Sequence, residues 1–200
     1  MKTYLKLLFI VNFILFITLF SFAIHVFNLD IYSQKFRENG AYDTFGKDKV
    51  DEVNSQVFDY FLLKNNLETD FFNDREKEHL KDVRSLFIAS YVLLFLTLIA
   101  LIFSIYFYRK DAFNLFLISG IAGLSSVFII ILLYFIDFNF LFNLFHEIFF
   151  AEGTWSFDSN IVQVYTYDLF YSMFLRVLIT STIFFVIAIL AFLIKNRLKY

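Results

Sequence analysis

The chain has 200 residues, 60% of them hydrophobic and 32 of them phenylalanine, and its mean hydropathy is +0.68. Its formal net charge is −2, and nothing in the distribution of Lys and Arg suggests nucleic-acid binding. The absence of cysteine excludes disulfides, thiolate metal sites, cysteine nucleophiles and lipids attached to cysteine.

Four segments are long and almost free of charge, and we expect each to cross a membrane as a helix. A run of about 18 or more apolar residues is long enough to cross a hydrocarbon core about 30 Å thick. These segments are apolar all round, whereas the helices of a soluble core are apolar on one side only. They cover residues 7–27, 85–108, 112–136 and 174–194.

The first segment has an alternative interpretation as a signal peptide, because Ser21-Phe22-Ala23 resembles a cleavage site. Its apolar run exceeds the about 7–15 residues that are usual in signal peptides. We therefore interpret it as a retained helix. His25, near the end of this helix, is expected to have a structural or interfacial role.

The positions of Lys and Arg predict the orientation of the chain. These residues lie before the first span, between the second and third, and after the fourth: Lys2, Lys6, Arg109, Lys110, Lys195, Arg197 and Lys199. The stretch 137–173 has none. Because basic residues favour the cytoplasmic side, we expect both termini in the cytoplasm and the loops 28–84 and 137–173 outside.

The first outer loop contains an apolar pattern that predicts an amphipathic helix. Apolar residues recur at spacings of three and four, namely Val50, Val53, Val57, Phe58, Phe61 and Leu62. Such a helix would lie on the membrane surface or cap the helical bundle. Whether it only packs there or acts as a gate stays open at this point.

The stretch "FFNDREKEHLKDVRSLF", residues 71–87, is typical of a helix start. Asn73 or Asp74 can cap the helix, and acidic residues in the first turn suit its dipole. We expect this helix to continue without a break into the second span. One of its faces would carry a set of mostly charged side chains: Arg75, Glu78, His79, Asp82 and Leu86.

The third span and the stretch after it combine packing and polar signals. Gly120 and Gly123 lie inside the apolar span, where small residues allow close helix packing. The following "FNFLFNLFHEIFF" is apolar but polar on one side, so we expect a re-entrant or interfacial segment with that side turned inward. Its polar residues are Asn143, His146 and Glu147. An ionisable residue at this depth is a candidate functional residue.

The remaining motifs limit the kinds of reaction that the chain could catalyse. "HEIFF" lacks the second histidine of a zincin, since Phe150 stands there. A zinc site built from His79, His146 and a carboxylate is an alternative without a spacing signal. No G-x-S-x-G elbow and no S-x-x-K occurs in the spans. Two histidines with acidic neighbours suit acid–base chemistry on a substrate that carries its own nucleophile. Asp82 or Glu78 would fix the tautomer of His79 and raise its basicity.

Two of these stretches resemble the signature blocks of the bacterial lipoprotein intramolecular transacylase (Lit) family. They are "EKEHLKDV", residues 76–83, and "FHEIFF…W.FD", residues 145–158. Family members are four-span proteins of about this length with the same order of spans and histidine-bearing loops. The stretch 164–170 departs from the family, because Thr166 and Tyr167 stand where members tend to carry proline and glutamate. We assign that stretch no catalytic role.

The resemblance implies an all-α integral membrane protein, a single membrane domain over residues 1–200 in the bacterial cell membrane, with its active site on the outer face. The implied enzyme is an acyltransferase. It moves the sn-2 acyl chain of a diacylglyceryl-cysteine lipoprotein to that lipoprotein's own N-terminal amine. Membrane lipids are further partners, and no cofactor, metal or nucleic acid is implied.

The catalytic histidines of the family correspond to His79 and His146. We expect them within about 10 Å of each other on the outer side, lining one polar cavity open to lipid, because both must reach a single ester. Residues assigned supporting roles are Arg75, Glu78, Asp82, Glu147, Trp155 and Asp158. Arg75 or backbone N–H groups near Gly153 are candidates for oxyanion stabilisation. Trp155, Tyr165, Tyr167 and Tyr171 also fit an interfacial aromatic belt.

Two other functions remain as alternatives at this point. One is a non-enzymatic membrane sensor or scaffold whose outer histidines respond to pH or bind a metal. The other is a hydrolase or acyltransferase that acts on phospholipids. The sequence contains no indication of an oligomeric state.

Overall fold

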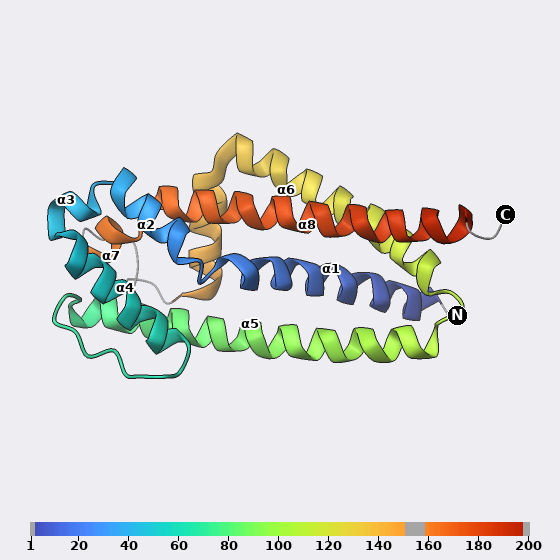
Figure 1. Cartoon of the computed structure of the whole chain (residues 1–200), viewed down its shortest axis with the longest axis horizontal. Coiled ribbons are helices and arrows are strands. Elements are labelled where there is room, and N and C mark those ends of the chain that lie inside the picture. Colours follow the sequence, from blue (N-terminus) through green and yellow to red (C-terminus); the bar gives the residue numbers. More distant parts are fainter. Residues whose placement is uncertain (1–2, 151–158, 198–200) are drawn as a thin grey trace. The chain divides into compact units, whose positions relative to one another are not determined.

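The structure is a computed structural model that describes residues 3–150 and 159–197 (Figure 1). These residues form helices and no strands, which confirms the all-α expectation. The helices are α1 (Thr3–His25), α2 (Leu29–Glu38), α3 (Ala41–Phe45), α4 (Lys47–Phe61), α5 (Asp74–Phe107), α6 (Ala112–Phe149), α7 (Asn160–Val164) and α8 (Tyr167–Arg197).

Four helices are long and apolar enough to cross a membrane: α1, α5, α6 and α8. The last three have 34, 38 and 31 residues, more than the about 20 that a span needs. Contacts group the described chain into two compact units. We call residues 3–25, 90–136 and 175–197 the membrane unit. We call residues 26–89, 137–150 and 159–174 the loop unit.

The membrane unit packs around aromatic rings and two glycines. The Phe13 ring centroid lies 5.5 Å from that of Phe116 and 6.3 Å from that of Phe185. A Cβ atom at Gly123 would lie 2.5 Å from the Phe185 ring, and one at Gly120 would lie 2.7 Å from Ile189 Cγ1. Both glycines therefore allow α6 and α8 to approach closely, as their position in the span predicts.

Polar side chains inside the membrane unit join helices by hydrogen bonds. His25 Nε2 lies 2.7 Å from Thr180 Oγ1, which links α1 to α8. Asn12 donates to the Thr97 carbonyl at 3.1 Å, which links α1 to α5. Interhelical hydrogen bonds of this kind stabilise helix association in lipid. His25 thus has the structural contact that its position suggested.

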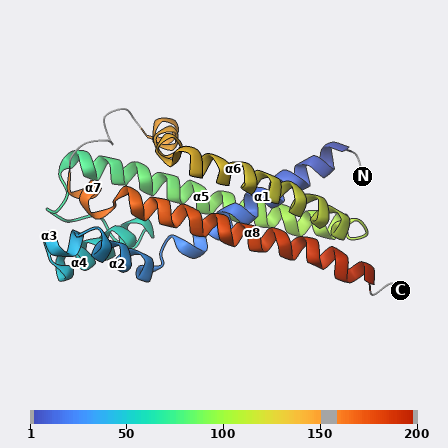
Figure 2. The ribbon, with the colours of Figure 1, turned by 90° about the horizontal axis from the view of Figure 1, so that it is seen from above.

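The loop unit contains the predicted amphipathic helix as α4, which lies beside α2 and α3 (Figure 2). Val50, Val53 and Val57 are at most 1% exposed, and Phe58 and Phe61 are also buried. Leu62 is 42% exposed, so its assignment to the apolar face was wrong. The helix ends at Phe61, and Leu62 is the capping residue beyond the helical repeat.

The start of α5 confirms Asn73 as its cap. Asn73 Oδ1 accepts a hydrogen bond from the Glu76 N–H at 3.0 Å, and Glu76 Oε2 accepts one from the Asn73 N–H at 2.7 Å. This reciprocal pair is a capping box. The helix then runs unbroken from Asp74 to Phe107, as the sequence predicts.

Helix α6 changes character at Asp137, where the backbone is not helical (φ −160°, ψ 90°). The Asp137 carboxylate accepts a hydrogen bond from the Phe140 N–H at 3.0 Å and so caps a new helical segment. That segment bears His146, which is 8% exposed, whereas Asn143 and Glu147 are exposed. The expectation that all three face inward was therefore wrong for Asn143 and Glu147. Aromatic rings, described below, share the face of His146 instead.

Candidate active site

The side chains of His79 and His146 meet within the loop unit, one from α5 and one from the last part of α6. Their ring centroids are 6.1 Å apart, and the ring planes differ by 18°. This agrees with the expectation that the rings lie within about 10 Å of each other. Two imidazoles that are 67 residues apart in sequence therefore face each other.

Phenylalanine rings surround the two imidazoles. The Phe142 and Phe150 centroids lie 4.1 and 5.1 Å from that of His146, and Phe150 is also 4.7 Å from His79. Phe142 and Phe150 are four residues before and after His146, so all three share one helix face. The rings described next to the pair are therefore aromatic, whereas a polar surrounding was expected.

A backbone hydrogen bond determines the tautomer of His146. Its Nδ1 lies 2.7 Å from the carbonyl oxygen of Phe142. A carbonyl oxygen only accepts hydrogen bonds, so Nδ1 is assigned the proton. In the neutral ring Nε2 then carries the lone pair. The contact therefore positions Nε2 of His146 as a proton acceptor.

His79 differs from His146, because its buried Nδ1 has no hydrogen-bond partner among the described residues. It lies six residues before the apolar segment that starts at Ser85. Burial first, and then the charge of His146, lower the pKa of His79 from 6.5 to about 4, against the opposing effect of Asp82. Asp82 thus acts in the expected direction, but burial outweighs it, so His79 is neutral at pH 7.

The residues assigned supporting roles are exposed or half-buried, or they lie outside the described residues. Arg75, Glu78 and Glu147 are exposed, and Asp82 is half-buried. Trp155, Asp158 and Gly153 lie outside the described residues. In residues 3–150 and 159–197, no three side chains of His, Asp or Glu come together in a way that could hold a metal ion.

Glu76 is a buried carboxylate that the sequence interpretation treated only as part of an acidic first turn. It is 1% exposed. Besides the capping bond from Asn73, its Oε1 accepts a hydrogen bond from the Ile161 N–H at 2.7 Å. Asn160 donates to the Phe71 carbonyl at 2.7 Å. The two bonds to Glu76 satisfy the buried carboxylate. The bond from Ile161 also holds the first turn of α5, which leads into His79, against α7. The spacing Asn73-x-x-Glu76 was the available signal.

The stretch that departs from the family has hydrogen bonds of its own. Asn39 donates to the Val164 carbonyl at 3.2 Å and to Thr166 Oγ1 at 3.1 Å. The Tyr165 hydroxyl donates to Asn54 Oδ1 at 3.1 Å. Burial raises the pKa of Tyr165 well above its usual value, and nearby Tyr32 raises it further, so this hydroxyl stays a donor. These contacts connect α2 and α4 to the segment between α7 and α8.

Comparison with known proteins adds a family and a fold. A family model described as lipoprotein intramolecular transacylase Lit matches residues 4–171. A solved structure of the membrane integral lipoprotein intramolecular transacylase Lit from Bacillus cereus superposes with a TM-score of 0.86 at 16% identity, covering 98% of this chain and 97% of that chain.

Two variants of the Bacillus cereus protein are similar to the same degree. The variant with one histidine replaced by arginine has a TM-score of 0.81 at 15% identity, covering 98% of this chain and 94% of its own. The variant with that histidine replaced by alanine has a TM-score of 0.82 at 15% identity, covering 98% and 95%. No curated protein matched this chain.

At these identities the likeness to solved structures shows the fold alone, namely a membrane-integral helical protein. The family match carries the activity, because it covers most of the chain. The chain therefore belongs to the lipoprotein intramolecular transacylase (Lit) family, whose members are acyltransferases.

Proposed function

We propose that this enzyme moves the sn-2 acyl chain of a diacylglyceryl-cysteine lipoprotein onto the amine of that lipoprotein's own N-terminal cysteine, with His79 and His146 as the catalytic residues. Membership of the family supports an intramolecular acyl transfer on a lipoprotein. One observation supports the histidine chemistry. Two imidazoles face each other at 6.1 Å in an aromatic frame, with the tautomer of one set by the backbone.

The reaction forms one bond and breaks one. The amine nitrogen attacks the ester carbonyl carbon, and the tetrahedral intermediate then loses the glyceryl oxygen. An amide forms at the nitrogen, and a free hydroxyl remains on the glycerol. The nitrogen gives up one proton and the glyceryl oxygen gains one, so a group that accepts and returns a proton is sufficient. Because amine and ester belong to one molecule, positioning supplies much of the rate enhancement, and no protein nucleophile is needed.

His146 is the proton acceptor in this scheme. The hydrogen bond from its Nδ1 to Phe142 leaves Nε2 with a lone pair. A base with its acceptor atom already oriented does not have to reorganise before proton transfer. After the nitrogen has attacked, the proton held on Nε2 is returned to the departing glyceryl oxygen.

His79 assists from the opposite side of the pair. Since its pKa is lowered to about 4, it is neutral and can donate one N–H hydrogen bond to the developing oxyanion or to the glyceryl oxygen. Its Nδ1 has no partner among the described residues, so this atom is not engaged elsewhere in that part of the chain. His146 thus transfers the proton, and His79 stabilises the developing charge by a hydrogen bond, in one transition state.

We also infer that the imidazole pair acts on the outer face of a bacterial cell membrane, with both termini in the cytoplasm. The support is the absence of Lys and Arg from 137–173 and their presence at the chain ends. Single cysteines at Ser55 and Lys110 test this in intact cells, because the chain has no other cysteine. A membrane-impermeant maleimide should label the first and not the second. The reverse pattern would overturn the orientation.

The activity is tested with a synthetic diacylglyceryl lipopeptide that carries palmitate at sn-1 and oleate at sn-2, incubated with the full chain in lipid vesicles. Intramolecular transfer leaves the mass unchanged, so fragment ions must locate the oleoyl group on the cysteine nitrogen. The matched control substrate has an acetylated N-terminus and should stay intact.

Other outcomes select the alternatives. Loss of oleate with gain of water would identify a hydrolase, and oleate appearing on vesicle lipids would identify a phospholipid acyltransferase. An unchanged lipopeptide would support a non-enzymatic sensor. Palmitoyl on the nitrogen would contradict the sn-2 assignment while leaving the transacylase activity in place.

A further inference from the structure

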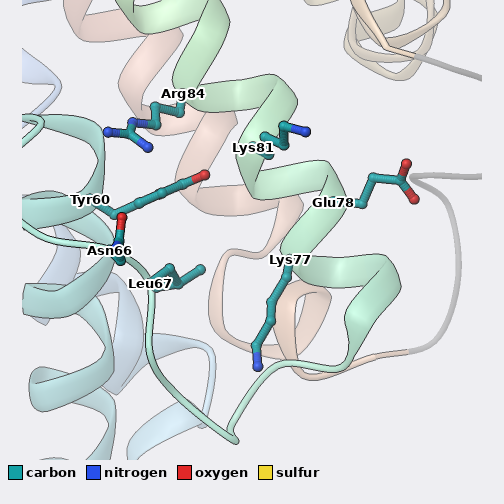
Figure 3. A pocket seen from close by; sticks show the side chains of 7 residues that line it. All are labelled: Tyr60, Asn66, Leu67, Lys77, Glu78, Lys81 and Arg84. Atoms are coloured by element: carbon teal, nitrogen blue, oxygen red, sulfur yellow. The ribbon is translucent and has the colours of Figure 1, made fainter.

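The loop unit contains a cavity of about 390 Å³ that the acyl transfer does not use (Figure 3). One helix, α5, contributes its charged lining, and α4 and the following segment contribute the opposite wall. The lining residues are Tyr60, Asn66, Leu67, Lys77, Glu78, Lys81 and Arg84. Three of the seven carry positive charge and one carries negative charge, so the cavity favours an anion.

The three cations come from one stretch of α5, and no ion pair with them is found among the described residues. Lys77, Lys81 and Arg84 follow one another at spacings of four and three, which places them on one face of α5. None of the three forms an ion pair within the described part of the chain. The Glu78 carboxylate points away from Tyr60 and Arg84 in Figure 3.

Arg84 is the most firmly positioned of these cations. Its guanidinium carbon lies 4.3 Å from the centroid of the Tyr60 ring. Stacking of this kind uses the face of the guanidinium and leaves the N–H groups at its edge available for bidentate bonds to oxyanions. Its Nε is buried and has no hydrogen-bond partner among the described residues. The planar guanidinium of Arg84 is therefore held in place, and its Nε–H can still donate a hydrogen bond.

The position of these residues along α5 matches the depth of lipid headgroups. Arg84 directly precedes the apolar segment that begins at Ser85. Lys77 lies seven residues earlier, about 10 Å along a helix axis. The headgroup layer on each side of a bilayer is roughly 5–8 Å thick. With the expected span boundary at Ser85, the three cations would lie within this layer, where the phosphates of membrane lipids lie.

We propose that this cavity is a binding site for a phosphate group, carried by a phospholipid headgroup at the membrane surface or free in solution. Arg84 binds two phosphate oxygens through its edge, Lys81 and Lys77 neutralise the charge, and the Asn66 amide is a further donor on the opposite wall. The site is separate from the imidazole pair in its lining residues and does not depend on the proposed acyl transfer. A phospholipid bound here would hold the first turns of α5 against α4.

The test is native mass spectrometry of the full chain in detergent, titrated with dioleoylphosphatidylglycerol, with dioleoylglycerol as the phosphate-free match. We expect one tightly bound phosphatidylglycerol and no comparable dioleoylglycerol. Each basic residue near a phosphate contributes roughly fivefold in affinity. The double variant Lys81→Gln/Arg84→Gln should therefore bind phosphatidylglycerol roughly 25-fold more weakly.

The control variant is Lys49→Gln/Lys64→Gln, which removes the same charge from exposed lysines of the loop unit that pair with Glu52 and Asp59. It should stay within twofold of the parent chain. If the Lys81/Arg84 double variant unfolds, Lys81→Gln and Arg84→Lys alone carry the test. The first removes an exposed charge, and the second keeps the charge but loses bidentate binding.

The possible outcomes distinguish a lipid headgroup from free phosphate and from no phosphate site. Competition by millimolar inorganic phosphate shows that the free ion also occupies the cavity, and its absence assigns the site to a lipid headgroup. Equal binding of dioleoylglycerol, equal weakening in both double variants, or unchanged binding after Lys81→Gln and Arg84→Lys would overturn the proposal. The proposal would also be overturned if binding of an acidic peptide depended on Arg84 while binding of phosphatidylglycerol did not.

Discussion

The membrane unit and the loop unit differ in how their polar side chains are hydrogen-bonded. Besides the interhelical bonds of His25 and Asn12, several hydroxyls of the membrane unit bond to a carbonyl four residues back in the same helix, as Ser126 does with Ala122 and Thr182 with Leu178. In the loop unit, polar groups bond across long stretches of chain. Glu76 and Ile161 are 85 residues apart in sequence, and Asn39 and Val164 are 125 apart.

This difference indicates which unit fixes the relative positions of distant segments. A hydroxyl bonded to its own helix needs no partner segment, so the membrane unit depends mainly on apolar length and close packing. A carboxylate bonded to a distant N–H fixes two segments relative to each other. The imidazole pair lies in the unit of the second kind. Substitutions in the loop unit should therefore affect catalysis first, and those in the membrane unit should affect stability first.

The largest effect is expected at the imidazoles. His79→Ala and His146→Ala should each lower turnover of the lipopeptide by roughly 10²- to 10⁴-fold, because the first removes a hydrogen-bond donor to the transition state and the second removes the proton acceptor. The double variant should lose much less than the product of the two, since residues acting on one transition state are not additive. His25→Ala, in the membrane unit, should stay close to the parent activity. Full acyl transfer by a stably inserted His146→Ala protein would end the two-histidine mechanism.

A smaller effect, on both stability and turnover, is expected when Glu76 is replaced. Replacing it with alanine leaves the buried N–H of Ile161 without its acceptor, which costs about 1–3 kcal/mol, and also removes the capping bond to the N–H of Asn73. The start of α5 should loosen, lowering both thermal stability in detergent and turnover per folded molecule. Glu78→Ala is the matched control, because Glu78 is exposed on the same helix. Turnover unaffected by Glu76→Ala in folded protein would show that this contact does not position His79.

In the membrane unit, Gly123→Leu should reduce stability and spare catalysis. A Cβ at this position would lie 2.5 Å from the Phe185 ring, so α6 and α8 must separate. Overpacking of this kind costs about 1–3 kcal/mol. Thermal unfolding in detergent and lipopeptide turnover, normalised to folded protein, measure the two effects. Ser125→Leu, at an exposed position of the same helix, is the control. If Gly123→Leu lowered turnover per folded molecule but left thermal stability unchanged, the division between the two units would be contradicted.

The smallest effect is a pH dependence of stability that His79 contributes. Its pKa is about 4 in the folded chain and 6.5 as its ordinary value. Between these values the unfolded chain binds a proton that the folded chain excludes, so stability falls as pH decreases from 6.5 towards 4. His79→Gln should unfold with a weaker pH dependence over this window. Parallel curves for parent and variant would show that burial does not lower this pKa.

Local patterns in the sequence were sufficient for several features, and each has a local cause. The spans follow from continuous apolar runs, because backbone groups in lipid must be satisfied within a helix. Asn73 as a cap and the buried face of α4 follow from spacings of three and four residues. Gly120 and Gly123 as packing positions follow from small residues inside a span. The pairing of His79 with His146 followed from the family resemblance rather than from spacing.

Only the tertiary structure decided the contacts that join distant segments. It turned His146 inward and left Asn143 and Glu147 exposed, because Phe142 and Phe150 occupy the same helix face and pack with His146. It showed that burial outweighs Asp82 at His79. It also gave Glu76 a partner 85 residues away. Helical periodicity specifies which side chains share a face, but which face is covered, and by what, depends on segments that the chain brings together only when it folds.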